Sequence, residues 1–123
     1  TLTSSSRNKR GDILKFIESF MKTNSETYLF DAIYLFCDLN KIDITTMLLE
    51  VSIHYEDGAR KYSENNWRNG MPVHCFMDSG IRHYIKWMRG DQDEPHDRAF
   101  VWNLVGAIWT MENKPEFNDI SGY

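Results

Sequence analysis

The side chains most capable of chemistry gather between residues 54 and 103. All four histidines and three of the four tryptophans lie in this stretch. Imidazole changes charge near neutral pH and binds transition metals, whereas an indole ring can stack on a nucleotide base. These residue types make a site for a phosphorylated or metal-bound ligand the first hypothesis.

Arg82 and His83 are neighbours, and the basic residues Lys86 and Arg89 follow within two turns of a helix. Arginine binds phosphate oxygens bidentately, and histidine carries a proton near neutrality. The plainer alternative is a surface ion pair between Asp78 and Arg82, one turn apart, worth about 0.3–0.5 kcal/mol. The functional interpretation gains weight only in combination with the cation at position 61.

The segment from residue 61 to 67 combines a cation, two aromatic rings and an amide. Its members are Lys61, Tyr62, Asn66 and Trp67. A ring can stack on a base, an amide can hydrogen-bond to the edge of the base, and lysine can pair with phosphate. The alternative is a loop anchored by a buried Trp and Tyr, which is common in proteins.

Asn103 stands inside an otherwise apolar predicted helix. A buried amide must find hydrogen-bond partners. We therefore expect Asn103 either to tie down a loop or to contact a ligand.

Two further patterns have a chemical and a structural interpretation. His96 and Asp97 form a dipeptide that some metal-dependent phosphohydrolases use, but Asp97 is better explained as a helix cap, with His96 left open. Glu50, His54 and Asp57 share one side of a predicted helix and could hold a divalent cation. Without a repeated carboxylate motif, an ordinary solvated face is the favoured interpretation.

Helical periodicity places these residues on about five helices. Apolar residues recur every three or four positions, and no segment alternates with period two. The sequence therefore predicts an all-α protein, a compact bundle of about five helices joined by short loops. The expected helices cover residues 11–22, 26–39, 44–65, 76–88 and 97–112. Asp12 is the expected cap of the first helix, and Asp43 or Thr45 that of the third.

The length of 123 residues favours one domain. We expect a disordered tail over residues 1–10, a single helical domain over 11–115 and an irregular C-terminal tail over 116–123. The net charge of −4 and pI near 5.5 argue against nucleic-acid binding. No apolar run reaches the roughly 20 residues of a membrane span. Two isolated cysteines, Cys37 and Cys75, suggest reduced thiols in a cytoplasmic protein.

Four segments read together carry a family resemblance: HYEDGARKYSENNW, DSGIRHYIKWMRGD, DEPH and FVWN. They resemble the N-terminal domain of phage dATP/dGTP diphosphohydrolases, a helical family also found as short stand-alone proteins in phages, prophages and bacteria. Ser63 departs from the family pattern, which has glycine at this position. The matching positions, spread over about half of the chain, are Gly58, Ala59, Lys61, Tyr62, Asn66, Trp67, Asp78, Ser79, Arg82, His83, Gly90, His96, Trp102 and Asn103.

The resemblance implies hydrolysis of a purine deoxynucleoside triphosphate to the monophosphate and pyrophosphate, with a divalent metal ion such as Mg, Mn or Co. It also implies a homo-oligomer. The alternative is a non-catalytic helical module of phage or prophage origin that binds a nucleotide or a protein. That module would not need its basic and imidazole side chains to converge, whereas the enzyme requires them around one pocket with carboxylates.

The resemblance further implies a role for each matching polar residue. The expected catalytic residues are His83, Lys61 and Arg82. Substrate binding is expected from Lys61, Tyr62, Asn66, Trp67, Arg82 and Asn103. The expected metal ligands are His83, His96 and Asp78, and the two histidines could instead carry protons.

Overall fold

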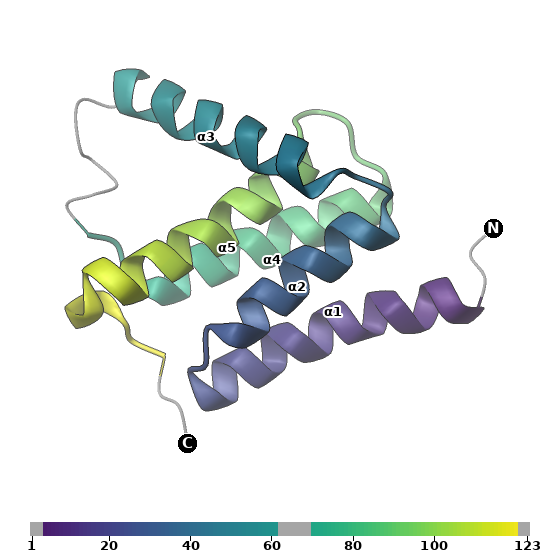
Figure 1. The fold of residues 1–123 in the computed structure, drawn as a ribbon, viewed down its shortest axis with the longest axis horizontal. Helices are drawn as coiled ribbons and strands as arrows, with labels where there is room; N and C mark the ends of the chain where they lie inside the picture. Colours follow the sequence, from purple (N-terminus) through teal and green to yellow (C-terminus); the bar gives the residue numbers. More distant parts are fainter. Residues whose placement is uncertain (1–3, 62–69, 121–123) are drawn as a thin grey trace. The chain divides into compact units, whose positions relative to one another are not determined.

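The computed structural model is all-α, as predicted. It describes residues 4–61 and 70–120, except the side chains of residues 4–9 and 54–61. These residues contain five α-helices and one short 3-10 helix, and no strand (Figure 1). The elements are α1 (Ser4–Thr23), α2 (Thr27–Leu39), α3 (Ile44–Lys61), α4 (Val73–Arg89), α5 (His96–Asn113) and η2 (Pro115–Phe117).

The chain divides into two compact units. One comprises residues 1–46 and 120–123, and the other comprises residues 47–119. Each unit is built around a pair of packed helices, α1 with α2 and α4 with α5. The expectation of a single domain over residues 11–115 stays a prediction. No helix among the described residues is long and apolar enough to cross a membrane.

In the first unit, α1 and α2 form a helical hairpin (Figure 1). The predicted apolar stripe of α1 is buried at Ile13, Ile17 and Phe20, and Phe16 stacks on Tyr28 with 6.5 Å between ring centroids. The buried residues of α2 are Leu29, Ala32, Ile33, Phe36 and Cys37. Helical spacing of apolar residues thus identified the two packing surfaces correctly.

The first helix begins eight residues earlier than Asp12, its expected cap. Residues 4–10, expected to be part of a disordered tail, belong to α1. Gly11 is exposed and nothing lies within 4 Å of where its Cβ would be. A glycine inside a helix costs only about 1 kcal/mol against alanine. No proline interrupts residues 4–23, and the helix continues through Gly11.

Two residues with positive φ end the helices of this unit. Asn24 (φ 60°) follows α1, and Lys41 (φ 56°) follows α2. The backbone N–H groups of Lys41 and Ile42 donate to the carbonyls of Asp38 and Cys37, which closes the end of α2. The predicted ends near residues 23 and 40 are therefore confirmed.

The start of α3 is also confirmed. Asp43 accepts hydrogen bonds from the backbone N–H and the hydroxyl of Thr46, at 2.9 and 3.0 Å. These bonds satisfy a donor that the first turn of a helix leaves unpaired. They also lower the pKa of Asp43, the backbone bond most of all. Of the two expected caps, Asp43 is the one used.

In the second unit, α4 and α5 run antiparallel and share a core. Tyr84 packs on Phe100 with 5.3 Å between ring centroids. Gly80 lets the helices approach closely, because a Cβ there would lie 3.1 Å from Leu104 and 3.3 Å from the Cβ of Asn103. This close packing fixes the two helices that carry the candidate site.

Both ends of α4 depend on specific backbone contacts. The helix ends at Arg89, and Gly90 (φ 87°) donates to the carbonyl of Trp87, as expected for a glycine that follows a helix. The helix begins at Val73, three residues earlier than expected. Asp119, in the C-terminal segment, accepts a hydrogen bond from the backbone N–H of His74 at 3.0 Å. The expected irregular tail therefore contains a cap for a helix that begins 46 residues earlier.

Candidate metal centre

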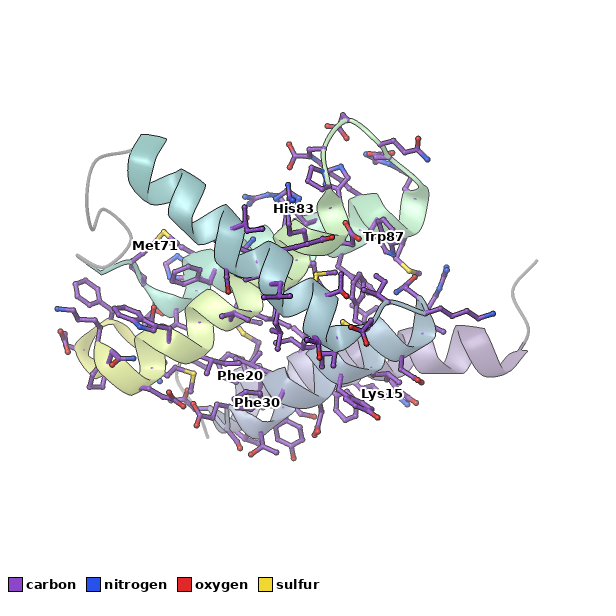
Figure 2. The ribbon with its side chains drawn as sticks, turned by 45° about the horizontal axis from the view of Figure 1, so that its top comes forward. Lys15, Phe20, Phe30, Met71, His83 and Trp87 are labelled. Atoms are coloured by element: carbon purple, nitrogen blue, oxygen red, sulfur yellow. The ribbon has the colours of Figure 1, made fainter. Side chains whose placement is uncertain are left out.

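The end of α4 and the start of α5 bring His83 and His96 together. The residues from Gly90 to Pro95 turn the chain back, so the last turns of α4 face the first turn of α5. The Nδ1 atoms of His83 and His96 lie 2.9 Å apart, and the ring centroids 5.1 Å apart. Figure 2 labels His83 beside this connector. Two imidazole nitrogens thus converge from different helices.

Two carboxylates of the connector complete the cluster. Glu94 Oε1 lies 3.3 Å from His83 Nδ1 and 3.8 Å from His96 Nδ1. Asp93 Oδ1 lies 2.7 Å from His96 Nε2, on the other side of the ring. Glu94 therefore faces the gap between the imidazoles, whereas Asp93 supports one of them from behind.

Asp93 determines which nitrogen of His96 carries a proton. An ionised carboxylate only accepts hydrogen bonds, so His96 Nε2 donates to Asp93. In the neutral ring, this leaves the lone pair of Nδ1 directed toward His83 and Glu94. A carboxylate that holds a metal-binding histidine in this way is a recurrent feature of metal centres.

Burial favours the neutral form of His83. Its pKa is lowered chiefly by burial, and further by the nearby His96, Lys86 and Arg82, while Glu94 acts in the opposite direction. The side chain of His96 is fully buried, whereas that of His83 is 18 % exposed. A neutral imidazole has one lone pair. Because Nδ1 of His83 donates to Nδ1 of His96 in the metal-free protein, the proton of His83 must move to Nε2 before Nδ1 can bind a cation.

Two sets of three residues have the chemistry and spacing of a cation site among the residues with described side chains. In each set, the candidate ligand atoms lie within 4.8 Å of one another. The first is His83, Glu94 and His96; the second is Asp91, Asp93 and His96. Asp91 already forms an ion pair with Arg89, and Asp93 is hydrogen-bonded to His96. The first set, which we call the histidine site, is therefore the better candidate.

The donor atoms of the histidine site indicate which ions it suits. Two imidazole nitrogens and one carboxylate oxygen suit Mn, Co or Zn, whereas Mg prefers oxygen ligands and retains several waters. Three protein ligands would leave positions for water or a substrate. The residues therefore fit a divalent transition metal with an open coordination position.

Comparison with known families supports the resemblance found in the sequence. The family model described as dATP/dGTP diphosphohydrolase, N-terminal, matches residues 23–120. The chain belongs to this family. The match extends beyond the four motifs and includes α2 and the whole histidine site. No curated protein and no solved structure matches the chain.

The structure brings together two of the three metal ligands expected from the family pattern. His83 and His96 meet, whereas Asp78 is exposed, lies five residues before His83 and belongs to neither set. The negative charge of Asp78 instead contributes to raising the pKa of His74. Glu94, rather than Asp78, is the carboxylate that lies next to both histidines.

The predicted phosphate-binding residues are only partly described. Arg82 is exposed and adjacent to His83, and Lys86 is half-buried one turn further along. Lys61 is the last residue of α3, but its side chain lies outside the described residues, as do Tyr62, Asn66 and Trp67. The same holds for His54 and Asp57 of the alternative cation face, of which only exposed Glu50 is described.

The hydrogen bond described for Asn103 goes to its own helix rather than to a loop, and contact with a ligand stays a prediction. Asn103 is only 3 % exposed, and its Nδ2 donates to the carbonyl of Ala99 in its own helix at 2.8 Å. Its Cβ lies against Gly80, about 10 Å along α5 from His96 at 1.5 Å per residue. Asn103 therefore lies where α4 and α5 touch, and its side-chain hydrogen bond holds it to its own helix, α5.

Asp97 does not cap α5 as expected. It is in the first turn of α5, but the helix starts after Pro95 with no side-chain cap. It still has the charge that suits a helix N-terminus. Of the pair His96–Asp97, only His96 belongs to the histidine site. Asp97 is its neighbour in sequence.

Sequence reasoning assigned no role to Glu94 or to Asp93. Both belong to the acidic connector GDQDEPH, which follows the predicted helix that carries His83 and ends in His96, just before the next predicted helix. A connector this short between antiparallel helices must lie close to both helix ends. Its two central acidic residues, between two histidines, were the available signal.

Proposed function

We propose that this protein hydrolyses a purine deoxynucleoside triphosphate, dATP or dGTP, to the monophosphate and pyrophosphate, using a divalent metal ion at the histidine site. Family membership supports the substrate class. The observation that carries the proposal is the convergence of His83, His96 and Glu94 from α4, α5 and the connector between them. The non-catalytic alternative does not require this convergence.

The metal ion would polarise a phosphate oxygen and acidify a water molecule. His83 and His96 would hold the ion through Nδ1, because these are the nitrogens that face Glu94. Asp93 would keep His96 in the required tautomer. Of the predicted ions Mg, Mn and Co, this donor set favours Mn or Co.

The positive charges beside the site would act on the triphosphate. Water adds to a phosphorus atom, the bond to the bridging oxygen breaks, and pyrophosphate leaves with the negative charge that develops. Arg82 and Lys86 are near enough to lower the pKa of His83 by their charge, so they are near enough to stabilise an anion there. Lys61, Tyr62, Asn66 and Trp67 keep their predicted roles toward the phosphates and the base, and a homo-oligomer stays a prediction.

The test is a turnover panel on the full chain. Each dNTP and NTP is incubated with Mg, Mn or Co, and the products are separated by chromatography. His83→Gln is compared with His74→Gln, which changes another histidine of the same helix far from the site. Circular dichroism verifies that both variants keep the helical content of the wild type.

We expect the monophosphate and pyrophosphate from dATP or dGTP, fastest with Mn or Co. His83→Gln should lower kcat by about 100-fold or more, the scale of losing a group that acts on the attacking water. His74→Gln should retain the wild-type kcat. No turnover of any nucleotide with any metal by folded wild-type protein would refute the proposal and leave the nucleotide- or protein-binding module as the alternative.

A further inference from the structure

A second group of reactive side chains lies at the opposite end of α4. Asp119 Oδ2 is hydrogen-bonded to His74 Nδ1, and Asp119 Oδ1 accepts the backbone N–H of His74 at 3.0 Å. The other ring nitrogen of His74, Nε2, lies 3.5 Å from the Sγ of Cys75. A carboxylate, an imidazole and a thiol therefore stand in series.

Asp119 gives the two nitrogens of His74 different roles. The carboxylate orients the ring and accepts the proton on Nδ1, so Nε2 is directed at the sulfur. The pKa of His74 is raised, chiefly by this hydrogen bond and also by the charges of Asp119 and Asp78, against an opposing effect of desolvation. The hydrogen bond to Asp119 thus favours the protonated ring next to the thiol.

The position of Cys75 in the helix also favours a negative charge on sulfur. It is the third residue of α4, in the turn where backbone N–H groups give the helix a partial positive charge. A histidine cation is disfavoured by this same field, and the carboxylate of Asp119 compensates for it. Reactive thiols in proteins have these neighbours: a helix N-terminus and a cationic imidazole.

Accessibility separates Cys75 from the other cysteine of the chain. Cys75 is partly exposed, whereas Cys37 is buried with 2 % of its surface accessible. The side chains of His74 and Asp119 are 49 % and 41 % exposed. A small reagent can therefore reach the group around Cys75.

We propose that Cys75, His74 and Asp119 form a nucleophilic thiol site that reacts with hydroperoxides. The roles correspond to those of cysteine–histidine–carboxylate groups in general: the sulfur attacks, the imidazole holds the proton, and the carboxylate orients the imidazole. The proposal is independent of nucleotide hydrolysis, since none of its residues belongs to the histidine site.

The chemical step balances with hydrogen peroxide as the oxidant. The thiolate of Cys75 attacks one peroxide oxygen, so that an S–O bond forms and the O–O bond breaks. Hydroxide leaves and takes the proton from Nε2 of His74, giving water. The sulfur is oxidised to a sulfenic acid and the peroxide is reduced, and an external thiol can then reverse the modification.

The test measures the reactivity of Cys75 on the full chain as a function of pH. Iodoacetamide labelling is followed by peptide mass spectrometry, with free glutathione as reference and Cys37 as an internal control. The same samples are exposed to hydrogen peroxide, and the sulfenic acid is trapped with dimedone. Asp119→Asn and His74→Gln are compared with the wild type, and Cys75→Ser verifies the site of labelling.

At about pH 6, Cys75 should be alkylated at least tenfold faster than glutathione. Asp119→Asn and His74→Gln should lose most of this advantage at about pH 6 but react like the wild type at about pH 10, where thiols in general are ionised. Peroxide should give a trapped sulfenic acid at Cys75 and none at Cys37.

An alkylation profile of Cys75 that follows glutathione would overturn the proposal. So would Asp119→Asn and His74→Gln variants with the wild-type rate at low pH, which would assign Asp119 to capping α4 alone. Labelling of Cys37 detects unfolding, because an unfolded variant would also expose this buried cysteine to the reagent.

Discussion

The two ends of α4 carry the same pair of groups, a histidine and a carboxylate, in opposite environments. His74, in the first turn, is half exposed and hydrogen-bonded to Asp119, which raises its pKa. His83, about 14 Å further along the axis by helical rise, is mostly enclosed, and burial lowers its pKa although Glu94 is near. The stronger of two opposing effects therefore decides the charge at each end.

The difference shows how one helix can support two kinds of chemistry. Burial removes the water that stabilises a cation, so His83 keeps a lone pair for a metal ion. A direct hydrogen bond to an exposed carboxylate stabilises the cation of His74, which then polarises a neighbouring thiol. The number of carboxylates near a histidine does not determine its role, whereas burial and hydrogen-bond geometry do.

The largest expected effect is the response of stability to metal. A ligand that binds only the folded state at 100 times its Kd stabilises it by about 2.7 kcal/mol. We expect Mn or Co at that excess to raise the free energy of unfolding of the wild type by this amount relative to protein in EDTA. Urea unfolding followed by circular dichroism measures the change.

Removing one carboxylate at each end of α4 tests the comparison. Glu94→Gln deletes a metal ligand. The rise in the free energy of unfolding that the metal gives should therefore be largely lost in this variant at the same metal concentration. Asp119→Asn leaves the histidine site intact and should retain the full response. Equal responses of the two variants would contradict the assignment of the metal to the His83 end.

A smaller effect is expected from Asp93, which touches His96 but not the proposed ion. Asp93→Asn should weaken Mn or Co binding by about 10–100-fold, the usual cost of losing a carboxylate behind a metal-binding histidine. Titration calorimetry measures the Kd. The matched control is Asp91→Asn in the same connector, which breaks an ion pair with Arg89 and removes a member of the second set of residues. If Asp91→Asn weakened binding as much, the second set of residues would be the metal centre.

Local chemistry made much of the fold predictable from the sequence. Asp43 caps α3 because its side chain reaches the N–H three residues later. Gly90 ends α4 because it adopts positive φ without strain. The apolar stripe of α1 packs on α2 because of its spacing alone. Each of these features depends on residues a few positions apart.

The features that were missed depend on residues far apart in the chain or on a loop path. Asp119 caps α4 from 45 residues beyond His74, which no local pattern encodes. The roles of Asp93 and Glu94 depend on how the connector folds back between two helices. The pairing of His83 with His96 was predictable only as family knowledge, because helical periodicity places His83 on one helix and His96 just before the next but does not align the two helices.

The smallest effect, and the most direct test of the comparison, is the titration of the two histidines. In metal-free protein, nuclear magnetic resonance should give His74 a midpoint above the ordinary 6.5 and His83 a midpoint below it. The folded state then gains stability from His74 below pH 6.5 and loses it as the pH rises through the raised pKa. For His83 the sign is opposite: stability falls as the pH drops below 6.5, because the unfolded chain binds a proton that the folded protein resists.

Asp119→Asn separates the two contributions. Its loss of stability should appear between the ordinary pKa of Asp119, 3.8, and the raised pKa of His74, where both partners are charged in the wild type. Burial acts to raise the pKa of Asp119, but the hydrogen bonds from His74 and other local effects together lower it, so the window extends below that value. The midpoint of His83 should not change in this variant. A shift of both midpoints in the same direction would show that the two ends of α4 are coupled, and that their charges are not set by local burial and hydrogen bonding.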